Sequence, residues 1–225
     1  MFNRALIAAV AACGIGSTAY AGIAMSFADP VPGRQWHNEA NGGGAGIGFM
    51  TYDSTASLSF LFDGSEDSLP NHTFVNAVMQ LEMTIGAATT LGGVTTAPVS
   101  GFFKIYDGSI APENIIIIGI ADAGTYVRIS NTNSILFSDP SFSYVAGPAL
   151  EAITGPIVFT DPSEAVFTLT SVVAAGGGSF LNPDGTFKTF DANASFSGNT
   201  QAVPAPGALA LVGLGTLVMA KRRRG

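Results

Sequence analysis

The sequence has few charged residues, and positive charge is especially scarce. Only 11% of its 225 residues are charged, with 9 Lys and Arg against 16 Asp and Glu, so the formal net charge is −7. A chain this poor in cations lacks the basic stripe that binding to phosphates requires, which argues against nucleic acid as a partner. Its hydrophobic fraction of 47% is too high for a disordered chain and is sufficient to bury a core.

Residues with catalytic chemistry are also rare. The chain has two histidines, His37 and His72, and lacks the motifs Gly-x-Ser-x-Gly, His-Glu-x-x-His and Gly-Lys-Ser/Thr. We therefore predict that the protein is not an enzyme. A hydrolase remains an alternative, because a Ser/His/Asp triad is assembled by the fold rather than by spacing; it would need one of the two histidines in a cleft beside a Ser or Asp.

The few charges that are present are segregated along the chain. All sixteen carboxylates lie between Asp29 and Asp191, where only four cations occur, so this body carries 4 − 16 = −12. The other five cations are at the ends: Arg4, Lys221, Arg222, Arg223 and Arg224. This separation is typical of membrane topology signals.

The N-terminus has the three parts of a secretory signal peptide. Arg4 precedes an apolar run at residues 5–12, and small residues lead to Ala19 and Ala21, which form an A-x-A cleavage site. We predict that residues 1–21 are removed after Ala21. The alternatives are a buried N-terminal helix and lipidation of Cys13, which follows a lipobox-like sequence. If the leader is removed, the mature chain has no cysteine, which excludes disulfides and thiol chemistry.

The C-terminus has a motif, an apolar helix and a basic cluster. The motif residues are Val203, Pro204, Ala205 and Pro206. Prolines are tolerated at the start of a helix but not inside it, so we expect a helix over the apolar residues 208–220. The cluster Lys221, Arg222, Arg223 and Arg224 should stay on the cytoplasmic side of a membrane. A plain transmembrane anchor and an ordinary buried helix are the alternatives.

This tail resembles the PEP-CTERM sorting tail of exported bacterial proteins. The resemblance covers only the last 23 residues, and it departs from the family at Ala205, where Glu is usual. It implies insertion into the inner membrane, recognition by an exosortase-like processing enzyme and cleavage near the motif. Family members are typically surface or extracellular proteins of bacteria that make exopolysaccharide and biofilm.

The body between these ends has the pattern of an all-β protein. Alternation of apolar and polar residues predicts strands at 56–60, 79–85, 126–130, 166–170 and 192–196, and a β-branched run predicts a buried strand at 115–118. Val127 and Ile129 are expected to face inward, and Asp161-Pro162 is expected to form a turn. The best helix candidate is 146–154. We predict an antiparallel β-sandwich of about ten strands, with a jelly roll favoured over a barrel.

Two features of the body are candidate binding sites. The acidic loop that contains Asp63, Glu66 and Asp67 offers the oxygen ligands that Ca²⁺ prefers, although a solvated acidic turn has the same sequence. The single tryptophan, Trp36, lies beside polar residues and is either a stacking platform for a sugar or an anchor packed into the core.

These observations predict three regions: a signal peptide at 1–21, a β-sandwich domain at 22–202 and a sorting tail at 203–225. The expected function is that of an exported, non-enzymatic surface or extracellular-matrix protein, with a structural or adhesive role linked to exopolysaccharide. The alternative is a carbohydrate-binding β-sandwich module, with or without stabilisation by Ca²⁺; no other cofactor is expected.

Overall fold

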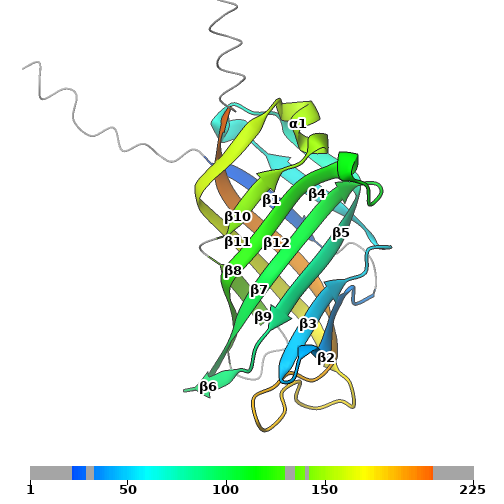
Figure 1. The fold of residues 1–225 in the computed structure, drawn as a ribbon, viewed down its shortest axis with the longest axis vertical. Helices are drawn as coiled ribbons and strands as arrows, with labels where there is room; N and C mark the ends of the chain where they lie inside the picture. Colours follow the sequence, from blue (N-terminus) through cyan, green and yellow to red (C-terminus); the bar gives the residue numbers. More distant parts are fainter. Residues whose placement is uncertain (1–21, 29–32, 130–134, 140–141, 205–225) are drawn as a thin grey trace, which may run out of the picture.

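The protein folds as one antiparallel β-sheet that closes on itself (Figure 1). The structure is a computed structural model, and it describes residues 22–28, 33–129, 135–139 and 142–204. The strands are β1 (Ile23–Ala28), β2 (Trp36–Gly44), β3 (Ile47–Tyr52), β4 (Ser57–Asp63), β5 (Asn71–Ile85), β6 (Thr89–Leu91), β7 (Val94–Asp107), β8 (Ile115–Ile129), β9 (Ile135–Asp139), β10 (Ser143–Ala146), β11 (Ile157–Ala174) and β12 (Phe190–Pro204). The helical pieces are η2 (Ser65–Asp67), η3 (Pro112–Asn114) and α1 (Pro148–Thr154).

Two long strands, β5 and β12, allow the sheet to close. Along one edge, β5 pairs first with β4 and then with β3, while its other edge pairs with β7. In the same way, one edge of β12 pairs with β1 and β2 and the other pairs with β11. The strands β1-β4-β5-β3-β2-β12 thus form a closed ring of six, and β7, β8, β9 and β11 connect β5 to β12 on the other side.

The prediction of an all-β, antiparallel fold is confirmed, but the structure shows a closed barrel with extra strands where a jelly-roll sandwich was expected. The two architectures give the same sequence pattern, because in both of them each strand buries alternate residues. What distinguishes them is the pairing of β1 with β12, in which Ile23 lies opposite Thr200. Local alternation carries no information on such a distant pair.

The local predictions are largely confirmed, with two corrections. The helix expected at 146–154 is α1, which begins at Pro148. In β8, however, Tyr126 is buried and Val127 is only half-buried, so the inward face was assigned one residue out of phase. Asp161-Pro162 is a cis peptide within a bulge of β11 rather than a turn. A bulge accommodates proline because it interrupts the ladder of hydrogen bonds.

Aromatic side chains fill the barrel and join its walls. Phe167 of β11 lies 5.3 Å from Trp36 of β2 and 5.3 Å from Phe103 of β7, measured between ring centroids. Phe196 of β12 lies 5.0 Å from Phe167, and Phe27 of β1 stacks on Phe196 at 5.7 Å. One connected aromatic cluster therefore bridges strands from both sides of the barrel.

Both ends of the described body lie at the same end of the barrel, beside η2 (Figure 1). Strand β12 continues through Val203 and Pro204, which pair with Val158 and Ile157 of β11, so the sheet extends two residues past the expected boundary at residue 202. Within the described part of the chain, no helix has the length and apolar character needed to cross a bilayer. The predicted signal peptide and the tail from Ala205 onward lie outside the described residues.

We predict that Tyr126→Phe raises the free energy of unfolding by about 1 kcal/mol. The Tyr126 hydroxyl is buried with no hydrogen-bond partner among the described residues, and burial raises the pKa of its phenol. On folding, this hydroxyl loses its hydrogen bonds to water and gains none from the described residues, so its removal should stabilise the folded state. Tyr144→Phe is the matched control, because the Tyr144 hydroxyl donates to the Glu164 carbonyl oxygen at 2.7 Å, and it should lower stability. Urea denaturation measures both variants, and a loss of stability in Tyr126→Phe would contradict the prediction.

Candidate functional site

A groove runs along the outer face of β7 and β8, next to β5. Its two halves meet at Ser100 and Asp122, which line both, and the larger half has a volume of about 670 Å³. We call it the outer groove; its lining residues include Thr84, Ser100, Phe102, Lys104, Ile120 and Asp122. It is open along its length, so its shape suits an extended chain better than an enclosed small molecule.

The alternation of β7 places three of these side chains outside the barrel. Phe103 and Ile105 are fully buried in the core, and neighbouring residues of a strand point to opposite faces. Phe102 and Lys104 therefore lie on the outer face, together with Ser100. The Lys104 ammonium lies over the Phe102 ring, 5.1 Å from its centroid.

A bulge in β8 brings the carboxylate of Asp122 to the groove. Val99 of β7 pairs with Gly124, whereas Gly101 pairs with Ala121, so β8 has one residue more than β7 in this interval. Asp122 and the residue after it are consequently both exposed, against the usual alternation.

The outer groove combines the groups that bind polyols and sugars. Thr84 and Ser100 contribute hydroxyl groups, which lie 3.1 Å apart, while Asp122 contributes an acceptor and Lys104 a donor. Phe102 and Ile120 provide an apolar surface between them. This site was not predicted from the sequence, although one signal was present: Phe102 and Phe103 are adjacent in a strand, so one of them must face outward.

The acidic loop that was predicted to bind Ca²⁺ joins the beginning of β1 to the last strand, β12, at one end of the barrel. The Glu66 carboxylate accepts the backbone N–H of Gly22 at 3.1 Å, and the Asp67 carboxylate accepts that of Ala202 at 3.0 Å. Asp63 accepts hydrogen bonds from the hydroxyl and the backbone N–H of Ser65, which lower its pKa. No group of three or more His, Cys, Asp or Glu side chains suited to a metal occurs among the described residues. This arrangement gives the Ca²⁺ prediction no support.

Trp36 is buried in the core, so its ring cannot be the exposed platform for a sugar that was one of the two expectations. The side chain is fully inaccessible to solvent and packs against Phe167. The polar neighbours in its sequence were misleading, because β2 alternates and places Trp36 inward while His37 faces outward. The alternative expectation, an anchor within the core, describes what the structure shows.

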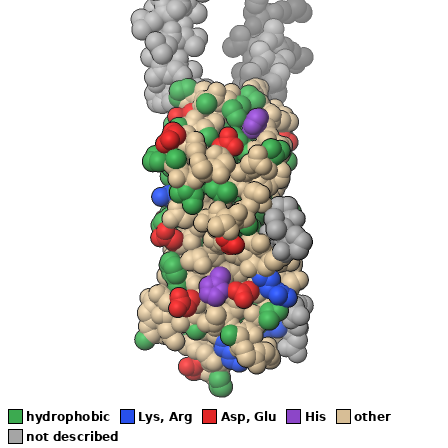
Figure 2. Space-filling view, turned by 90° about the vertical axis from the view of Figure 1, so that its right-hand side faces the viewer, with side chains coloured by type: hydrophobic (Ala, Val, Ile, Leu, Met, Phe, Trp, Pro, Cys, Tyr) green, Lys and Arg blue, Asp and Glu red, His purple; other side chains and the backbone are tan. Residues whose placement is uncertain are grey.

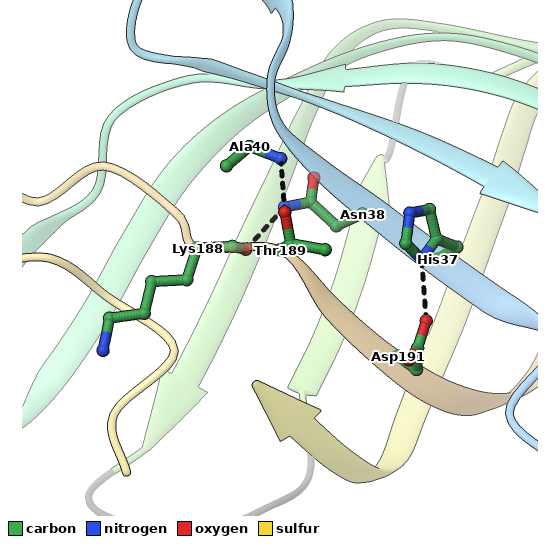
Figure 3. A network of polar contacts seen from close by, with 6 residues as sticks. All are labelled: His37, Asn38, Ala40, Lys188, Thr189 and Asp191. Atoms are coloured by element: carbon green, nitrogen blue, oxygen red, sulfur yellow. Dashed lines mark hydrogen bonds and ion pairs between the residues drawn. The ribbon is translucent and has the colours of Figure 1, made fainter. Parts of the chain in front are cut away.

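The two histidines lie apart from the outer groove. His37 Nδ1 lies 2.7 Å from Asp191 Oδ1, and both side chains are about half exposed (Figure 3). His72 of β5 packs edge-to-face on the Phe74 ring, with 4.5 Å between the ring centroids. Neither histidine lines the outer groove or the cleft beside Gly22 and Glu66. The arrangement of these residues therefore gives the hydrolase alternative no support.

The contacts around His37 stabilise the short antiparallel pairing of β2 with β12, which consists of three residue pairs. The buried Asn38 amide donates to the Lys188 carbonyl oxygen at 2.9 Å, and the Ala40 N–H donates to the Thr189 hydroxyl at 3.2 Å (Figure 3). We interpret this cluster as structural.

Stability is expected to fall as the pH drops below about 4. Asp53, Asp63 and Asp184 each accept two hydrogen bonds from the Ser or Thr two residues later, and these bonds lower the pKa of each carboxyl from 3.8. A lowered pKa gives stability that is present above the unfolded pKa and is lost as the pH falls through the folded one. The triple variant to Asn keeps the acceptor oxygens but cannot titrate, so its melting temperature should depend less on pH between 5 and 2. If the melting temperatures of the two proteins fall equally with pH, the prediction is wrong.

Acidic side chains occur along the full length of one face of the molecule, whereas most of the Lys and Arg side chains on this face lie toward the lower end (Figure 2).

Several residues of the predicted sorting signals lie outside the described part of the chain: the cleavage residues Ala19 and Ala21, the motif residues Ala205 and Pro206, and the basic residues 221–224. Of the predicted sorting motif, Val203 and Pro204 are described, as the last two residues of β12.

Comparison of the chain with family models, with curated proteins and with solved structures gave no significant match.

Proposed function

We propose that the protein is an exported, non-enzymatic surface or extracellular-matrix protein with an adhesive role linked to exopolysaccharide. The observation that carries the proposal is the distribution of charge: an acidic body lies between an N-terminal leader and a tail that resembles the PEP-CTERM sorting tail. By the positive-inside rule, the basic residues at both ends favour one topology, with the body outside the cytoplasm.

The shape of the body is compatible with attachment at one end. Gly22 and Val203, which lead into the predicted leader and tail, are both at the η2 end of the barrel. The larger half of the outer groove is lined by Ile47 and Thr89, from the opposite end (Figure 1). A body held at its η2 end would therefore present this groove away from the membrane.

Cell fractionation tests the sorting part of the proposal. The full chain should reach the envelope or the cell surface, whereas a variant that ends at Pro204 should be released from the membrane. Asp122→Asn is the control, because it alters the outer groove and should leave the location unchanged. Recovery of the full chain from the cytoplasm, with residues 1–21 still attached, would overturn the proposal.

A second candidate function is that of a carbohydrate-binding module, which the composition of the outer groove favours. Binding to extracted exopolysaccharide should weaken about tenfold in Phe102→Ala and in Asp122→Asn, since each variant removes one kind of contact with a sugar. Leu61→Ala changes another exposed apolar residue, on β4, and should bind as the unmodified protein does. Equal binding by all four proteins, or no binding at all, would count against this function.

A further inference from the structure

The described chain begins beside an acidic cleft between β1, β12 and η2. Gly22, Ala24, Asp63, Ser65, Glu66 and Asn199 line this cleft, which has a volume of about 380 Å³. We call it the N-terminal cleft. Of the described residues that line it, none is cationic and two carry carboxylates.

We propose that the N-terminal cleft binds the α-ammonium group that removal of the signal peptide creates on Gly22, so that processing completes the fold. This inference rests on the proposed function, which includes cleavage after Ala21. In the uncut chain, the Gly22 nitrogen is an amide that donates one hydrogen bond to Glu66, at 3.1 Å. After cleavage the same nitrogen has three donors and a full positive charge.

The charges around the cleft favour the ammonium form. Glu66 contacts the nitrogen directly, and Asp63 lines the same cleft. Asp67 lies on the same turn, and Glu164 of β11 pairs with Asn199. His72 of β5 is in register with Phe62 of β4 and does not line the cleft. A hydrogen bond between two charged groups is roughly twice as strong as one between neutral groups.

The same short turn joins the new N-terminus to the last strand. While Glu66 holds Gly22 at the start of β1, its neighbour Asp67 holds Ala202 near the end of β12. Strands β1 and β12 form the pair that closes the ring of six. The ion pair would therefore stabilise the closed barrel.

The proposed ion pair determines how the stability of the processed protein changes with pH. Nearby carboxylates raise the pKa of an α-amino group above its usual value of about 8. The added stability is therefore present below that value and is lost as the pH rises through the raised pKa.

The test uses the full chain after export, purified from the envelope in detergent. Mass spectrometry first establishes whether Gly22 is the N-terminal residue. The rate at which an amine-reactive reagent labels the Gly22 amine is then measured from pH 6 to 10. We expect the Glu66 carboxylate to raise the pKa of this amine, so that labelling at pH 8 is several-fold slower than in Glu66→Gln.

Glu113→Gln, in η3, is the matched control, because it removes one exposed carboxylate that does not line the cleft, and it should label like the unmodified protein. The melting temperature should also fall more between pH 7 and pH 10 in the unmodified protein than in Glu66→Gln. If Gly22 is the first residue but its amine titrates alike in all three proteins, the inference is overturned while export stands. A different first residue instead overturns the predicted cleavage itself, and the inference with it.

Discussion

Replacing Phe167 with alanine is expected to lower the free energy of unfolding by about 3–5 kcal/mol, the largest effect that we predict for a side chain. Phe167 is fully buried, and its ring contacts those of Trp36, Phe103 and Phe196, on three other strands. Alanine would leave a cavity where β11 meets the rest of the core, and rigid neighbouring rings cannot collapse into it. Urea denaturation followed by tryptophan fluorescence measures the loss, since Trp36 is the only tryptophan.

Phe102→Ala is the control for this prediction. It removes the same side chain from a strand, but from the outer face, where Phe102 is half-buried. Its cost should be about 1 kcal/mol. Similar losses for the two variants would show that the barrel does not depend on its central aromatic cluster.

Gly101→Ala is expected to lower the free energy of unfolding by about 2–4 kcal/mol, because two unfavourable effects combine. The backbone of Gly101 has φ of +137°, which residues other than glycine rarely adopt. A Cβ atom there would also overlap the Glu82 carbonyl oxygen and lie 2.6 Å from the Met83 Cα atom, both in the adjacent strand β5. Since backbone atoms cannot move aside as a flexible side chain can, β5 and β7 would have to separate.

Gly108→Ala separates the two effects. Gly108 has φ of +76°, but a Cβ atom there would meet nothing within 4 Å. This variant should cost about 1 kcal/mol from backbone strain alone. Thermal denaturation of both variants measures the difference, and equal losses would show that the close approach of β5 contributes nothing.

The strands could be predicted from the sequence because each buries one face against the core. The alternation at residues 79–85, for example, continues through the second half of β5, where every second side chain is buried. In β8, Tyr126 and Val127 are both large and apolar, so composition alone did not reveal which of them faces inward. The closure of the barrel was not predictable in this way, since it depends on pairing between strands that are far apart in the chain.

The candidate site was harder to predict than the strands. Unusual residues in the sequence were the candidates, yet Trp36 is part of the core, while Glu66 and Asp67 accept hydrogen bonds from backbone N–H groups. The outer groove consists of common residues, and Asp122 reaches it only because β8 contains a bulge. A bulge depends on the register between two strands, which cannot be read from one strand alone. The leader and the sorting tail remain predictions from sequence.

The pairing of the first described strand with the last has a consequence for biosynthesis. One edge of β1 is completed by β12, with Ile23 opposite Thr200, so the barrel cannot close until the ribosome has made almost the whole chain. Contacts between such distant segments form slowly, because a long loop must be ordered first. A nascent chain that stays open for this long can still be threaded through a narrow translocation channel, which is what the proposed route of export requires.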